Sequence, residues 1–148
     1  MYIDVREEDF QVNQELERFE ISSKTDAAIS LFVGKVRAEE NLISLNLDCY
    51  PDMAMREILN IAENAKKKWQ INNLTVIHRF GELLPGENIV FVITSSDHRT
   101  DCQEATQYIM DYLKNSAPFW KKEIYPDKEI WVEQKESDLR KLYQWENF

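Results

Sequence analysis

Basic side chains recur in this sequence where a strand or a helix is expected to end. Arg37 follows an apolar run, His98 and Arg99 lie between an apolar run and an amphipathic one, and Lys114 and Lys121 lie further along. Arginine and the free N–H groups at a helix start bind phosphate, while a partly desolvated lysine can act as an acid, a base or a nucleophile. These residue types are those of a site that binds an anionic substrate beside a reactive amine.

A simpler interpretation exists for each of these residues. Arg99 could pair with a neighbouring aspartate, Lys114 suits the dipole at a helix C-terminus, and Lys121 could be a solvated strand lysine. His78 ends another apolar run, where a histidine is usually a satisfied core or edge residue. The residues alone favour the simpler interpretation for His78 and for both lysines, and an anion site at residues 98–99 remains the alternative.

The composition limits the classes of function. The formal net charge is -9, from 27 acidic and 18 basic residues, which argues against generic nucleic-acid binding. Cys49 and Cys102 form no CxxC pair, and with two histidines no metal site is predicted. No cofactor is expected. No apolar run reaches about 18 residues and the start lacks a basic, apolar leader, so we expect a cytoplasmic protein that spans no membrane.

Motifs that mark a built-in nucleophile or a phosphate loop are also missing from the sequence. The chain has three glycines, and it contains neither a G-x-S-x-G elbow nor a glycine-rich nucleotide loop. No cysteine stands out as a nucleophile. If the chain is an enzyme, we expect its reactive group to come from another molecule.

The elements that must position these residues follow from the spacing of apolar side chains. One amphipathic helix begins at Pro51, and a second ends near residue 115, with Thr100 and Gln103 spaced as a capping box at its start. A shorter helix is expected within residues 7–19. Strands are expected at residues 1–5, 27–36, 42–50, 74–77, 89–94, 119–125 and 129–133. The second and third of these strands are expected to form a hairpin.

We therefore predict an α+β fold with two main helices in a single domain, residues 1–148. No linker rich in glycine, proline or serine divides the chain. The tail, residues 138–148, is charged and includes the aromatic side chains of Tyr143 and Trp145. Two outcomes are open for it, because it either forms a short helix or orders only against a partner.

Seven stretches stand in order along the chain: GKVR at 34–37, VIHRFGE at 76–82, PGE at 85–87, SSDHR at 95–99, IMDYLK at 109–114, APFWKKE at 117–123 and WVE at 131–133. In this order and spacing they resemble the catalytic (large) subunit of molybdopterin synthases. The APFWKKE stretch is the most specific of them. The resemblance covers about residues 27–138.

The resemblance implies a fold, a reaction and partners. The fold would be α+β, with a hammerhead-like part and an additional antiparallel sheet. The reaction would convert cyclic pyranopterin monophosphate into molybdopterin, during molybdenum cofactor biosynthesis. Its two sulfurs would come from the C-terminal Gly-Gly thiocarboxylate of a small ubiquitin-like subunit. Two large subunits would form a central dimer with one small subunit at each end. A borrowed sulfur donor fits a chain that shows no nucleophile of its own.

The resemblance also implies residue roles. Lys114 would polarise the carbonyl of the partner's last glycine, and Lys121 would be the general acid or base of sulfur transfer. Phe32 would lie near the channel for the partner's tail. The residues that match the family's substrate pocket are Arg37, His98, Arg99 and Lys135, of which His98 and Arg99 would come from across the dimer.

Two departures and two alternative functions accompany the resemblance. The turn after Arg37 is short, because residues 38–41 replace a longer, glycine-containing loop, and Lys135 stands where relatives often carry arginine.

The first alternative function is a scaffold that binds a ubiquitin-like sulfur carrier without catalysis. The second is a binder of phosphate ligands that acts alone. Lys114 and Lys121 argue against the scaffold, which needs no desolvated cations.

Overall fold

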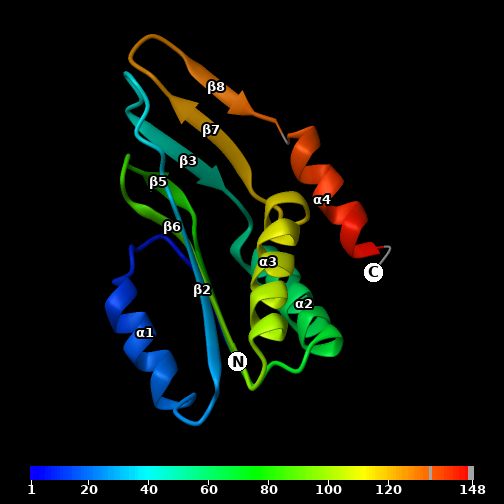
Figure 1. The fold of residues 1–148 in the computed structure, drawn as a ribbon. Helices are drawn as coiled ribbons and strands as arrows, with labels where there is room; N and C mark the ends of the chain where they lie inside the picture. The colour runs from blue at the N-terminus through cyan, green and yellow to red at the C-terminus, as the bar shows by residue number, and fades with distance from the viewer. Residues whose placement is uncertain (134, 147–148) are drawn as a thin grey trace.

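The computed structural model describes residues 1–133 and 135–146, which fold into two four-stranded β-sheets and four helices (Figure 1). Sheet A has the strand order β1-β4-β6-β2, and sheet B has the order β5-β3-β7-β8. The predicted α+β class is confirmed. Among the described residues, no helix combines the length and the apolar character that crossing a membrane requires.

Sheet A is covered by helices on both faces. Its strands are β1 (Tyr2–Arg6), β4 (Asn73–Arg79), β6 (Asn88–Ser96) and β2 (Ala28–Lys35), and the helices around it are α1 (Val12–Ile21), α2 (Pro51–Lys68) and α3 (Arg99–Asn115). Successive side chains of a strand point to opposite faces. Val76 and Val92 therefore join the core under α2 and α3, whereas Ile77 and Phe91 pack toward α1. The strand predicted at residues 89–94 is confirmed, and it is buried on both faces of the sheet.

Sheet B lies beside one end of sheet A (Figure 1). Its strands are β5 (Gly81–Leu83), β3 (Ser44–Asp48), β7 (Trp120–Ile124) and β8 (Glu129–Val132), and every pairing is antiparallel. Its apolar face forms a small core of Val36, Leu45, Leu47 and Leu83. A short connection, residues 116–119, leads from the end of α3 into β7. The last turn of α3 and the first residues of β7 therefore lie near each other.

Two local predictions are wrong. The hairpin of residues 27–36 with 42–50 does not form, because β2 pairs with β6 in sheet A and β3 pairs with β5 and β7 in sheet B. The apolar character of residues 27–36 and the alternation of residues 42–50 identified both strands but not their partners. The buried β6 takes a neighbour on each edge. The capping box is also absent: α3 begins at Arg99, and its N-cap His98 makes no side-chain cap bond.

The C-terminal segment forms α4 (Glu136–Glu146), so the short-helix alternative for the tail is observed over these residues. Residues 147–148 lie outside the described part. Trp145 is buried in the main core and packs edge-on against Trp69 and Tyr108. Its Nε1–H donates to Asp111 Oδ2 at 2.8 Å. The α4 helix is thereby attached to α3, and its first residues lie near the end of that helix.

Candidate functional site

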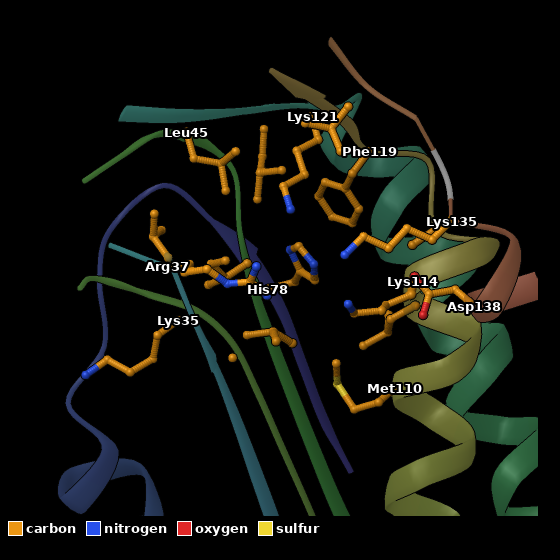
Figure 2. A pocket seen from close by; sticks show the side chains of 18 of the residues that line it. Lys35, Arg37, Leu45, His78, Met110, Lys114, Phe119, Lys121, Lys135 and Asp138 are labelled. Carbon is orange, nitrogen blue, oxygen red and sulfur yellow. The ribbon is translucent and has the colours of Figure 1, made fainter. Parts of the chain in front are cut away.

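A pocket of about 620 Å³ opens where sheet A, sheet B and the C-terminal end of α3 meet (Figure 2). Strand β2 and the residues after it line one side, from Phe32 to Arg37. The end of α3 and residues 117–121 line another side, and β3 contributes Leu45 and Leu47. Such a volume falls within the range typical of small-molecule sites, about 300–1,000 Å³.

Four of the residues implied by the resemblance bring positive charge to this pocket. Lys114 lies in the last turn of α3, Lys121 on β7, Arg37 after β2 and Lys135 before α4. Figure 2 shows the ammonium groups of the three lysines directed toward the same open space. Within the described residues, the one ion pair made by these four cations is that of Arg37 with Glu39, at 3.6 Å. The other three charges remain available to an anionic ligand.

Lys121 is the most perturbed of the four cations. Burial in the pocket lowers the pKa of its ammonium most, and the charge of Lys114 lowers it further. Glu123 opposes this effect, and Lys135 and Arg37 each add a smaller lowering contribution. The side chain is still exposed to water in the isolated chain. A lysine of this kind can exchange a proton at a pH nearer neutrality than an ordinary lysine.

Phe32 also lines the pocket, from the edge strand β2, and 42% of its surface is exposed. Gly34 lies two residues further along the same strand, and a Cβ at that position would come within 2.8 Å of a Val90 methyl carbon. The absence of a side chain at Gly34 therefore keeps this wall of the pocket close to β6. The wall offers an apolar surface to a ligand beside the cations.

His98 and Arg99 are not part of this pocket in the same chain. They mark the N-terminal end of α3, and Lys114 lies fifteen residues after Arg99 in the same helix. At about 1.5 Å per residue, this separation is about 22 Å along the helix axis. Both residues are exposed. The structure therefore gathers five of the seven implied site residues and leaves these two on a separate surface.

The sequence interpretation missed one residue of the pocket. His78 was expected to be a satisfied core or edge residue, and it is buried, yet it lines the pocket centrally between the lysines (Figure 2). The signal that could have found it is strand alternation, which places His78 on the same face of β4 as Val76, toward α3. Within the described residues, no group of three or more His, Cys, Asp or Glu side chains could hold a metal ion.

Comparisons with known proteins agree on one family. A family model described as MoaE protein matches residues 5–116. A molybdopterin synthase catalytic subunit from Brucella melitensis is 43% identical over 147 residues, which cover 97% of this chain and 90% of that protein. The solved structure of a molybdopterin biosynthesis MoaE protein from Burkholderia ambifaria has a TM-score of 0.83 and 36% identity, and 97% of each chain is covered.

A more distant structural relative adds information on assembly in that protein. It is a complex of subunits 1 and 2 of the molybdopterin-converting factor from Helicobacter pylori. The TM-score is 0.77 at 21% identity, with 90% of this chain and 91% of that chain covered. At this identity the likeness establishes a shared fold.

Proposed function

The chain belongs to the MoaE family, the catalytic subunits of molybdopterin synthase, and from this premise we propose how its pocket carries out sulfur transfer. The family places the chain among the sulfurtransferases of molybdenum cofactor biosynthesis. The proposed substrate is cyclic pyranopterin monophosphate. The proposed sulfur donor is the C-terminal Gly-Gly thiocarboxylate of a small ubiquitin-like subunit, which is used twice for each molecule of molybdopterin.

The observation that carries the proposal is that Arg37 and the lysines 114, 121 and 135 meet in one pocket that no cysteine lines, and that Lys121 among them has a lowered pKa. Neither Cys49 nor Cys102 lines the pocket. Both the phosphate of the substrate and the thiocarboxylate of the donor are anions, and each is stabilised by lysine or arginine. The sulfur must then come from another molecule, which fits a donor tail that enters between Phe32 and the lysines.

The chemical step assigns different work to the two lysines. The thiocarboxylate sulfur attacks a carbon of the pterin side chain and forms a new C–S bond, while the bond from that carbon to its oxygen substituent breaks and the oxygen leaves with a proton. Water then adds to the donor's carbonyl carbon, and the bond between that carbon and sulfur breaks, which leaves a carboxylate on the donor and the sulfur on the pterin. Lys114 polarises the donor's carbonyl oxygen, and Lys121 passes protons to and from the reacting groups.

His98 and Arg99 enter this scheme through a second copy of the chain. Their distance from Lys114 along α3 excludes a direct role in their own pocket unless the helix is broken. In a symmetric dimer, each chain could place its α3 N-terminus at the other chain's pocket. There Arg99 would hold the substrate phosphate with two hydrogen bonds, and His98 would add a further polar contact.

Subunit exchange between two inactive variants tests this arrangement. Lys121→Ala and Arg99→Ala are each expected to be inactive alone. An equal mixture that exchanges subunits should recover about a quarter of wild-type molybdopterin formation, because half of the dimers are mixed and each contains one intact site of two. The assay contains the thiocarboxylated small subunit and the pterin substrate.

The matched control for this mixture is Lys121→Ala with Lys114→Ala. Both of these residues belong to the same pocket, so a mixed dimer has no intact site and should remain inactive. Recovery in the control, or none in the test mixture despite demonstrated exchange, would contradict the shared site. Full activity of Arg99→Ala alone would remove Arg99 from the substrate pocket.

A further inference from the structure

His78 is a buried residue of the pocket to which neither the fold nor the proposed chemistry assigns a role. It lies near the end of β4, and 8% of its surface is exposed. Its ring stacks on Phe119, with the ring centroids 3.9 Å apart and the planes inclined by 16°. Both residues line the pocket. The stack fixes the plane of the imidazole, so the direction of its nitrogens is fixed as well.

One ring nitrogen is occupied and the other is open. Nδ1 lies 2.8 Å from the carbonyl oxygen of Arg79, which can only accept, so Nδ1 carries the proton and donates. Burial lowers the pKa of His78 to about 4, so the ring is neutral near neutral pH and Nε2 has a free lone pair.

Nε2 faces the pocket. Within the described residues, no group hydrogen-bonds Nε2. Among the described residues, Arg6 Nε is the one side-chain nitrogen or oxygen that is inaccessible to water and also lacks a hydrogen-bond partner. Nε2 is therefore not sealed, and the open space beside it is the pocket that His78 lines. Because buried polar atoms are nearly always hydrogen-bonded, an unpaired acceptor on a buried ring is suited to accept a hydrogen bond from a ligand.

We propose that His78 is a positioning residue whose Nε2 accepts a hydrogen bond from an N–H or O–H group of the bound pterin. In their charged forms the lysines and Arg37 can only donate, so they suit the anionic parts of substrate and donor. A pterin also carries neutral N–H and O–H groups, which need acceptors. The carboxylates that share the pocket are half-buried or exposed, whereas His78 is buried at its centre; they are Glu39, Glu123, Glu133 and Asp138. The inference rests on the proposed substrate.

Matched substitutions separate this role from a structural one. His78→Phe keeps the aromatic stack on Phe119 but removes the acceptor, and His78→Gln restores an acceptor without the ring. For His78→Phe we expect KM for the pterin to rise about tenfold while kcat changes little, because the lost contact exists before and during the reaction. His78→Gln should recover part of the loss. Unchanged KM in a folded His78→Phe protein would overturn the proposal.

A measurement on the unaltered protein covers the case in which the variants fail to fold. The chain has two histidines, so ¹⁵N-histidine labelling gives a spectrum of two side chains, and His98→Gln assigns them. In the free protein, Nε2 of His78 should resonate as an unprotonated nitrogen. Adding the pterin without the small subunit allows binding but no sulfur transfer, and the Nε2 signal should then move as it accepts a hydrogen bond.

The outcomes that contradict the proposal have two different meanings. If calorimetry shows that the pterin binds and the Nε2 signal of His78 does not move, the role of His78 is overturned and the proposed function stands. A protonated Nε2 in the free protein would overturn the role in the same way. If the pterin does not bind at all, in the presence or absence of the small subunit, the proposed substrate is wrong, and the proposal for His78 falls with it.

Discussion

Replacement of Lys121 by alanine is expected to lower the rate of sulfur transfer by about a hundredfold or more, the usual effect of losing a general acid or base. Lys121 lies on β7 in the pocket, and its pKa is lowered by burial and by Lys114, Lys135 and Arg37. Alanine keeps the strand but has no group that can exchange a proton. The measurement is the single-turnover rate with saturating thiocarboxylated small subunit and pterin.

The adjacent residue provides a matched control. Lys122 has the same charge on the same strand, but its Nζ pairs with Glu129 at 2.7 Å and lies over the ring of Trp131. Lys122→Ala should therefore leave the rate of sulfur transfer within a few-fold of wild type. A Lys121→Ala protein that binds both partners and reacts at nearly the wild-type rate would show that Lys121 is not the acid or base.

Replacement of Trp145 by alanine is expected to lower the free energy of unfolding by about 3–5 kcal/mol, the range for a buried aromatic residue. The indole is buried against Trp69 and Tyr108. The substitution leaves a cavity there. It also removes the indole N–H that donates a hydrogen bond to Asp111, a residue with 8% of its surface exposed. Equilibrium unfolding by denaturant measures the change.

Tyr143 is the control for this prediction, because it lies on the same helix and 61% of its surface is exposed. Tyr143→Ala should cost much less than Trp145→Ala. Equal stabilities of the two variants would mean that α4 does not pack on α3 in solution. Because Lys135 directly precedes α4, the Trp145 variant should also bind the anionic substrate more weakly than the Tyr143 variant.

The sequence predicted the elements better than their arrangement. Apolar alternation located the strand at residues 42–50, a nearly continuous apolar run located the strand at residues 89–94, and a period of 3.6 located both long helices, because each pattern is set by which faces of one element are buried. Strand pairing depends on distant segments, so the pattern could not reveal that β2 pairs with β6 rather than with β3. The three residues of β5 are too few to produce a pattern.

The candidate site was predicted in parts. The family resemblance suggested Arg37, Lys114, Lys121 and Lys135, and the fold brings them together because the short connection from α3 to β7 turns the chain back on itself. Residue types alone favoured a solvated Lys121, since the cations that perturb it come from other elements. The family resemblance also implied that His98 and Arg99 come from across the dimer, and the length of α3 gives a physical reason why a single chain cannot bring them to its own pocket.

The most direct test of the central claim is a single turnover with three purified components: this protein, the thiocarboxylated small subunit and cyclic pyranopterin monophosphate. Formation of the dithiolene product is measured with all three present and with each one omitted. The proposed function predicts product only in the complete mixture. No product while the small subunit is demonstrably bound would contradict catalysis and favour the scaffold, and product without the small subunit would contradict the proposed sulfur donor.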